Sequence, residues 1–124
     1  MRLINIIGVL YCFVPLYKRY KSKRSLIVFM NGLLYHTFDS SKILRKYDIL
    51  CNILIILYTN KKCNLTLKYS ILSTLLWCMN NYLCEKELIN KMLSDVVHVM
   101  GVHMPLSRGL EVALKVDRGL YLLE

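Results

Sequence analysis

The chain has 124 residues, of which 56% are hydrophobic, and its formal net charge at pH 7 is +9. This length suits one domain and excludes a second globular domain of ordinary size. A mean hydropathy of +0.40 would leave a small soluble monomer with large exposed apolar patches, which such proteins avoid. The composition therefore favours a protein whose apolar surface faces lipid over one with an unusually large core of its own.

The positive charge is concentrated in the first two thirds of the chain. Residues 1–84 contain 12 Lys/Arg and two acidic residues, whereas residues 85–124 contain five Lys/Arg and six acidic residues. This change of composition predicts two regions. We interpret residues 1–84 as a hydrophobic, basic region of membrane helices, and residues 85–124 as an amphipathic helix followed by a polar C-terminal tail.

Four apolar runs make up the first region, at residues 3–17, 25–38, 49–59 and 65–84. Only the last approaches the length of about 20 residues that a helix needs to cross a bilayer. Tyr and Lys side chains at the run ends can extend a short span, because tyrosine rings sit at headgroup level and lysine stems snorkel. The runs therefore predict an all-α, multi-pass membrane protein with three to four short transmembrane or hairpin helices.

A dense basic block, residues 18–24, follows the first run, whereas a cleaved signal peptide carries its charge in front of the run. We therefore expect an uncleaved helix. If all four runs cross, the loops at 18–24 and 60–68 share one side with eight Lys/Arg, which favours that side as the cytoplasmic one. A basic stripe beside an apolar run usually meets anionic headgroups, so no nucleic-acid partner is expected. The predicted headgroup contacts are Lys18, Arg19, Lys21, Lys23 and Arg24.

The second region begins with helical periodicity. Between residues 85 and 104 apolar residues recur at helical spacing on one side of the chain, and Gly101 with Pro105 is predicted to close this helix. The apolar face is a candidate surface for a protein partner, formed by Leu88, Met92, Val96 and Met100.

The tail shows a different period. From residue 110 to 117 apolar residues alternate with others, which is typical of a strand. Asp117-Arg118-Gly119 resembles a hairpin turn that leads into residues 120–123. These features predict a β-hairpin tail, with a continued helix as the competing interpretation.

The five cysteines are odd in number and include no CxxC pair, so the sequence supports neither a disulfide framework nor a zinc knuckle. A phosphate-binding glycine loop, a nucleophile elbow and an HExxH motif are also absent from the sequence. The motifs thus predict no catalytic residue and no cofactor.

Four polar residues around the second and third runs are candidates for a polar site within the membrane: Asn31, His36, Asp39 and Asp48. Ionisable groups at membrane depth are costly and usually face a bundle interior or a water-filled cavity. In the competing structural interpretation, the two aspartates cap helix ends and the histidine lies at the interface.

Part of this cluster resembles a known family. Residues 33–38, with Asp48 twelve positions after His36, resemble the His-then-Asp segment of the alkaline ceramidase-like membrane hydrolases. The resemblance covers about 20 of the 124 residues. It implies that His36 helps to bind zinc and that a late histidine pair completes the site, for which this chain offers His98 and His103.

The chain departs from that family in three respects. The family has seven spans where this chain offers four at most, and its serine position falls on Gly32. Its late histidines are also closer together, on one helix face. In a continuous α-helix, a separation of five residues at about 100° each places His98 and His103 roughly 140° apart, so they are not expected to bind one metal ion.

Taken together, these patterns favour a non-enzymatic structural or interaction component of a membrane. Two alternatives stay open. One is a small, soluble, all-helical interaction domain that forms oligomers, since runs of 11 to 15 residues also suit core helices. The other is a zinc-dependent, ceramidase-like lipid amidase or a fragment of one.

Overall fold

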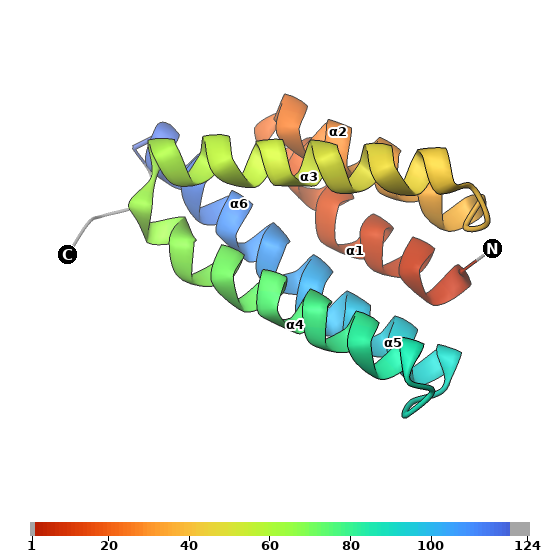
Figure 1. Cartoon of the computed structure of the whole chain (residues 1–124). Coiled ribbons are helices and arrows are strands. Elements are labelled where there is room, and N and C mark those ends of the chain that lie inside the picture. The colour runs from red at the N-terminus through yellow and green to blue at the C-terminus, as the bar shows by residue number, and fades with distance from the viewer. Residues whose placement is uncertain (1, 120–124) are drawn as a thin grey trace.

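The computed structural model describes residues 2–119, and this part of the chain consists of helices joined by short turns (Figure 1). The elements in chain order are α1 (Leu3–Tyr20), α2 (Lys23–Thr37), α3 (Lys42–Lys62), the 3-10 helix η1 (Asn64–Thr66), α4 (Leu67–Glu85), α5 (Lys91–His98), the π-helix η2 (Val99–His103) and α6 (Met104–Asp117). The prediction of an all-helical protein is therefore confirmed.

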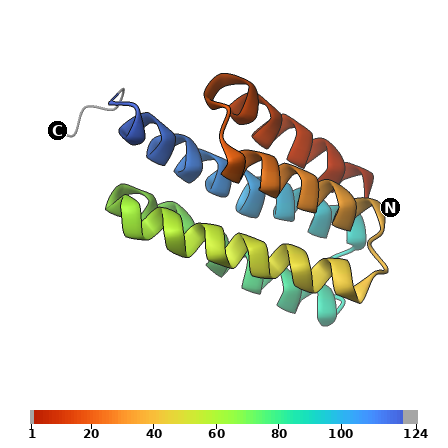
Figure 2. The ribbon, with the colours of Figure 1, turned by 90° about the horizontal axis from the view of Figure 1, so that it is seen from above.

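The helices form one antiparallel bundle. Figures 1 and 2 show that successive long helices run in alternate directions, so that the chain turns at two opposite ends of the bundle. α1 packs on α2, and α2 on α3, while α5, η2 and α6 follow one another as a continuous rod that packs along α4 and α1. This rod brings the late part of the chain against the N-terminal helix.

Polar side chains fix where three of the helices begin. The hydroxyl oxygens of Ser22 and Ser41 accept hydrogen bonds from the backbone N–H groups of Ser25 and Leu44, at the starts of α2 and α3. The side chain of Asn90 caps α5 in the same way. Such caps satisfy backbone donors that the first helical turn leaves without partners, and each stabilises its helix by about 1 kcal/mol.

The apolar core lies among α1, α2 and α6. It is built around Phe13 of α1, Val28 of α2 and Leu110 of α6, all buried. α3 and α4 have the opposite polarity, because their buried residues are polar: Asp48 and Thr59 in α3, Ser73 and Asn80 in α4. Their large apolar residues, among them Leu54, Leu57, Leu72 and Leu75, are exposed.

None of the helices within residues 2–119 combines the length and the apolarity that crossing a membrane requires. The predicted transmembrane helices thus correspond to real helices, α1 to α4, for which a membrane crossing is not supported.

The predicted β-hairpin is wrong for the residues that the structure describes. Residues 110–117 belong to α6. The apparent alternation misled because Ala113, which occupied a polar position in the strand pattern, is only 1% exposed. Leu110, Ala113 and Leu114 have helical spacing and form one buried face. The predicted second strand at 120–123 lies outside the described residues.

The predicted helix end at Gly101 and Pro105 is also wrong. The helical rod continues through both residues, and Pro105 lies in the first turn of α6. A proline inside an α-helix clashes with the carbonyl four residues earlier. The π-helix immediately before Pro105 widens the backbone turn at this point. The pattern of backbone hydrogen bonds therefore changes there, and the helical rod continues.

Candidate metal centre

Three histidines from two distant parts of the chain meet inside the bundle. His36 lies in the last turn of α2, His98 ends α5, and His103 ends η2. One ring nitrogen from each lies within 4.8 Å of those of the other two. The ring centroids are 5.4 Å apart for His36 and His98, 5.4 Å for His36 and His103, and 4.5 Å for His98 and His103.

The π-helix brings His98 and His103 together. In η2 the N–H of Met104 donates to the carbonyl of Val99, five residues earlier, and not four as in an α-helix. Residues five apart therefore lie nearly one above the other. The expected separation of roughly 140° is wrong, because it assumed a continuous α-helix. The wider turn of the π-helix accommodates one extra residue. Two histidines five residues apart therefore lie on the same face, as two histidines four residues apart do in an α-helix.

Burial keeps the three imidazoles neutral. Desolvation lowers the pKa of His36 to about 4 and that of His98 to about 3, and it lowers the pKa of His103 well below 6.5. The charge of Arg2 lowers the pKa of His36 and His98 further. A neutral imidazole is the form that binds a metal ion.

Two of the ring nitrogens have no partner within the described structure. Nδ1 of His36 and Nδ1 of His103 are buried and make no hydrogen bond to the described residues, although buried polar atoms nearly always have one. A tetrahedral zinc ion with Zn–N bonds of about 2.1 Å holds its ligand nitrogens roughly 3.4 Å apart. The candidate ligand nitrogens lie within 4.8 Å of one another, so binding requires the three rings to come closer by at most about 1.4 Å. The residues therefore fit a metal ion with three nitrogen ligands.

The three histidines line a cavity of about 360 Å³ among the helices of the bundle, to which α1, α2, α3, α4, α5, η2 and α6 all contribute residues. Asp48 of α3 lines the same cavity and is buried, and its Oδ1 has no hydrogen-bond partner within the described residues. Burial raises the pKa of Asp48 to about 6, against a smaller lowering by a hydrogen bond with Asn52. Most of the other lining is apolar, including Phe13, Ile53 and Ile56.

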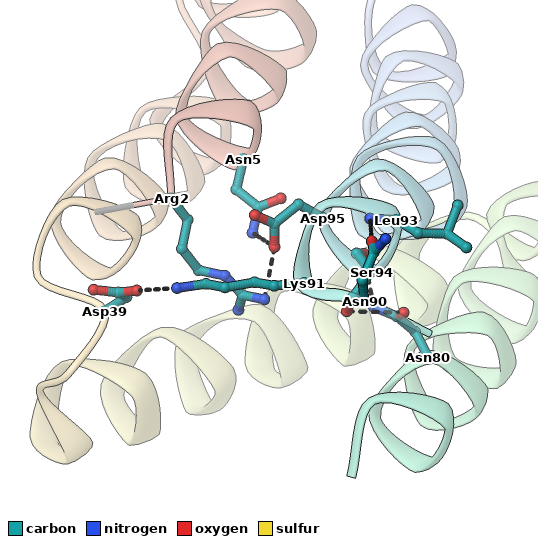
Figure 3. Close-up of polar contacts among 9 residues, drawn as sticks. All are labelled: Arg2, Asn5, Asp39, Asn80, Asn90, Lys91, Leu93, Ser94 and Asp95. Carbon is teal, nitrogen blue, oxygen red and sulfur yellow. Dashed lines mark hydrogen bonds and ion pairs between the residues drawn. The ribbon is translucent and has the colours of Figure 1, made fainter. Parts of the chain in front are cut away.

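A polar network, of which Arg2, Asn80 and Ser94 also line the cavity, holds α5, and with it His98, against the neighbouring helices (Figure 3). Arg2 pairs with Asp95 of α5 at 2.6 Å, and Asn5 of α1 donates to the same carboxylate at 3.4 Å. The backbone N–H of Arg2 donates to the carbonyl of His36 at 2.8 Å. Arg2 thus joins the end of α2 to α5.

Two further contacts fix the other sides of α5. Asn80 of α4 and Ser94 of α5 exchange hydrogen bonds at 3.1 Å. Lys91 pairs with Asp39, in the turn after α2, at 3.6 Å (Figure 3). α5 is therefore tied to α1, α2 and α4 by polar side chains.

The four residues predicted for a polar site have different places. His36 and Asp48 face the common cavity. Asp39 lies outside it, in the ion pair with Lys91, and Asn31 is buried in α2 without lining it. The family resemblance pointed to His98 and His103 as partners of His36, but their five-residue spacing in a continuous α-helix argued against a shared metal ion; Gly101 and Pro105 were the signs of irregular backbone nearby.

Comparison of the chain with protein-family models, with curated proteins and with solved structures finds no match.

Proposed function

We propose that this protein is a zinc-dependent hydrolase that cleaves an amide bond in a lipid-like substrate. The convergence of three neutral histidines, of which His36 and His103 are buried and His98 is half-buried, on one large cavity carries this proposal. A purely structural or interaction role, which the composition alone favours, gives no reason to hold three histidines in contact and leave two buried ring nitrogens without a partner.

The ligand set suits a catalytic zinc site. Structural zinc sites are closed by four protein ligands, whereas catalytic sites use three and keep one position open. His36, His98 and His103 supply three nitrogens beside a cavity that can hold a substrate. Zinc bound there supplies Lewis-acid polarisation of a carbonyl and activation of water at neutral pH.

Asp48 is the candidate general base. It lines the cavity from α3, opposite the helices that carry the histidines, and its Oδ1 is free of hydrogen bonds to the described residues. A pKa of about 6 lies close to neutral pH, where a carboxylate can accept a proton from water and return it to a leaving amine. No other carboxylate among the described residues lies as deep in the cavity; Glu85, which also lines it, is exposed.

The cavity lining indicates the substrate class. A volume of about 360 Å³ with mostly apolar walls is typical of sites for small apolar ligands, in which a few polar groups fix the orientation. Asn52, whose Oδ1 has no hydrogen-bond partner within the described residues, provides such a group. The resemblance of residues 33–48 to alkaline ceramidase-like hydrolases favours an amide of a long-chain lipid as the substrate.

We further propose that the bundle works in contact with a membrane. The inverted polarity of α3 and α4 supports this: their polar residues are buried and their leucines and isoleucines are exposed. Soluble monomers rarely expose so much apolar surface. The number of crossings stays a prediction. In carbonate-washed fractions the protein is expected in the membrane pellet, whereas the soluble oligomer left open above would stay in the supernatant.

Metal analysis and turnover test the enzymatic proposal. The wild-type protein, purified without chelators, is expected to hold about one zinc ion per chain and to hydrolyse fluorogenic N-acyl amides. His36→Ala, His98→Ala and His103→Ala are each expected to lose both properties. Met100→Ala is the matched control, because Met100 lies in the same π-helix and is exposed.

Two results would contradict the proposal. A folded wild-type protein, judged by helical circular dichroism, that binds no zinc would exclude the metal centre. A protein that binds zinc through the histidines but hydrolyses neither amides nor esters of any chain length would exclude the hydrolase and leave only the site.

A further inference from the structure

The fold gathers positive charge from four segments at one end of the bundle. We call this surface the basic end. It is formed by the junction of α1 and α2, the end of α3, the start of α4 and the end of α6, which lie together at the same end in Figures 1 and 2. Its Lys and Arg residues are Lys18, Arg19, Lys21, Lys23, Arg24, Lys61, Lys62, Lys68, Lys115 and Arg118.

Side-chain contacts join these segments into one surface. Arg24 of α2 donates to the hydroxyl oxygen of Thr59 in α3 at 3.0 Å and to the carboxylate of Asp117 in α6 at 3.1 Å. Arg118, just after α6, donates to the backbone carbonyl of Tyr20 in α1. The five predicted headgroup residues at 18–24 are therefore half of a larger cationic surface.

Most of this charge is left unneutralised by the described residues. The carboxylates at this end within residues 2–119 are Glu111, which pairs with Arg19 and Lys115, and Asp117, which pairs with Arg24. None of the ion pairs found in the described part involves the other lysines of the basic end, Lys18, Lys21, Lys23, Lys61, Lys62 and Lys68.

The opposite end is nearly balanced. It contains six Lys/Arg (Arg2, Lys42, Arg45, Lys46, Lys86 and Lys91) and five acidic residues (Asp39, Asp48, Glu85, Glu87 and Asp95). The charge of the protein is thus polarised along the bundle axis. A field of this kind orients a protein towards an anionic surface.

Tyrosines interleave with the cations of the basic end. Lys21 lies 5.6 Å from the ring centroid of Tyr17, Arg24 and Lys62 each lie 5.4 Å from that of Tyr58, and Lys68 lies 5.2 Å from that of Tyr69. Lys, Arg and Tyr together beside exposed apolar side chains are typical of the boundary between headgroups and acyl chains. Leu57 of α3 and Leu67 of α4 supply such apolar side chains.

We propose that the basic end lies among the anionic headgroups of a membrane leaflet. The opposite end of the bundle, which holds Arg2, Asp39 and Glu85, then points away from those headgroups. This inference rests on the membrane contact proposed above and is independent of the hydrolase. It places His36, at the far end of α2, away from the anionic headgroups.

The basic end suits lipid better than single-stranded nucleic acid. Binding of single strands relies on aromatic faces on which bases stack. Here Tyr58 already lies under two cations and Tyr20 is buried, with the guanidinium of Arg118 over its ring at 5.3 Å. These rings are thus engaged within the protein, whereas Lys18, Lys23 and Lys61 are exposed and take part in no ion pair or ring contact found among the described residues.

A vesicle experiment with charge-matched variants tests the inference. The basic-end variant Lys18→Gln/Lys23→Gln/Lys61→Gln is compared with the control Lys42→Gln/Lys46→Gln/Lys86→Gln. All six lysines are exposed, and none takes part in an ion pair among the described residues. The net charge changes equally in both variants. Binding is measured by flotation with phosphatidylcholine vesicles, with and without added phosphatidylserine, and helical circular dichroism verifies that each variant is folded.

Wild type and control are expected to bind vesicles that contain phosphatidylserine more tightly than vesicles of phosphatidylcholine alone. The affinity of the basic-end variant for the phosphatidylserine vesicles is expected to be at least tenfold lower than that of wild type. Equal losses in both variants would overturn the inference, because net charge and not the basic end would be responsible. Binding to both vesicle types without preference would also overturn it but keep the membrane contact. Binding to neither type of vesicle would overturn both this inference and the proposed membrane contact. Tighter binding to oligouridylate than to either vesicle would overturn the inference too, because the ligand of the basic end would then be a nucleic acid.

Discussion

Asp48 and the three histidines show how one buried cavity moves acids and bases towards their neutral forms. Burial raises the pKa of Asp48 to about 6 and lowers that of His36 to about 4. A neutral histidine can bind a metal ion, and a carboxylate with a pKa near neutral can exchange protons with water. Pairs of groups whose environments shift them in this way are common at active sites.

The raised pKa of Asp48 predicts that this residue costs stability. The folded protein holds the proton up to about pH 6, and the unfolded chain releases it near pH 3.8. The contribution of Asp48 to the free energy of unfolding therefore falls as pH rises from about 4 to about 6. Asp48→Asn is expected to stabilise the metal-free protein at pH 7 by about 3 kcal/mol, and by less than about 1 kcal/mol at pH 4.

Chemical denaturation of both proteins at the two pH values measures this effect, since their difference cancels the contribution of the histidines. Turnover in the zinc-loaded Asp48→Asn variant is expected to fall by about a hundredfold or more, with zinc content unchanged. A variant that is less stable at pH 7 and fully active would mean that Asp48 has a structural role only.

At the scale of single residues, the sequence allowed part of the site to be predicted. His36 and Asp48 drew attention because ionisable groups within or beside apolar runs need a reason to be there. Asp39 attracted the same attention, although it forms an ion pair with Lys91 outside the cavity. The family resemblance offered His98 and His103 as further zinc ligands. The spacing argument set them aside, because it assumed a continuous α-helix and could not foresee the π-helix between them.

The π-helix η2 is the element on which the histidine cluster depends. It packs against α1 where Gly8 leaves room for Val99: a Cβ atom built on Gly8 would lie only 2.5 Å from Cγ2 of Val99. Real Cβ atoms are essentially never so close to another heavy atom. The absence of a side chain at Gly8 therefore allows η2 to approach α1 and hold His98 and His103 at their present spacing.

Gly8→Ala is expected to push η2 away from α1. Overpacking of this kind costs roughly 1–3 kcal/mol of stability, and a displacement of the two histidines should weaken zinc binding at least tenfold. The double variant Gly8→Ala/Val99→Ala removes the clashing methyl groups and should recover most of both losses. Thermal denaturation and competition with a zinc chelator give the two readouts.

If the single variant bound zinc as tightly as wild type, the packing of η2 on α1 would have no part in the site. If the double variant failed to recover zinc binding, Gly8 would act through some route other than its contact with Val99.

Among the elements, the long helices could be predicted and the irregular backbone could not. The four apolar runs lie within α1, α2, α3 and η1 with α4, apart from a residue at one helix end, because a helix of this bundle needs an apolar stripe. α1 and α3 extend past their runs, to Tyr20 and Lys62. Tyr20 is buried in the core, and lysine is a good helix former. The β-hairpin prediction for the tail was wrong because Ala113 suits the buried face of a helix as well as the outward-facing position of a strand.

The candidate metal site and the excess positive charge lie in different parts of the molecule along the bundle axis. One half holds the histidines, Asp48 and the polar network around Arg2, and the other end carries the excess positive charge. The sequence predicted that the loops at 18–24 and 60–68 share one side, but it did not predict that the end of α6 lies beside them or that His98 faces His36. Both depend on contacts between distant segments: His36 with His98, and Arg24 with Asp117. Only the antiparallel packing of the helices joins them.

X-ray absorption at the zinc edge tests the metal centre most directly. The purified wild-type protein is predicted to show zinc with three imidazole nitrogens at about 2.0–2.1 Å and one further light-atom ligand, and the imidazole signal should disappear in His103→Ala. Sulfur ligands at about 2.3 Å would contradict this account, because they would place the metal on the cysteines and leave the three histidines without a role.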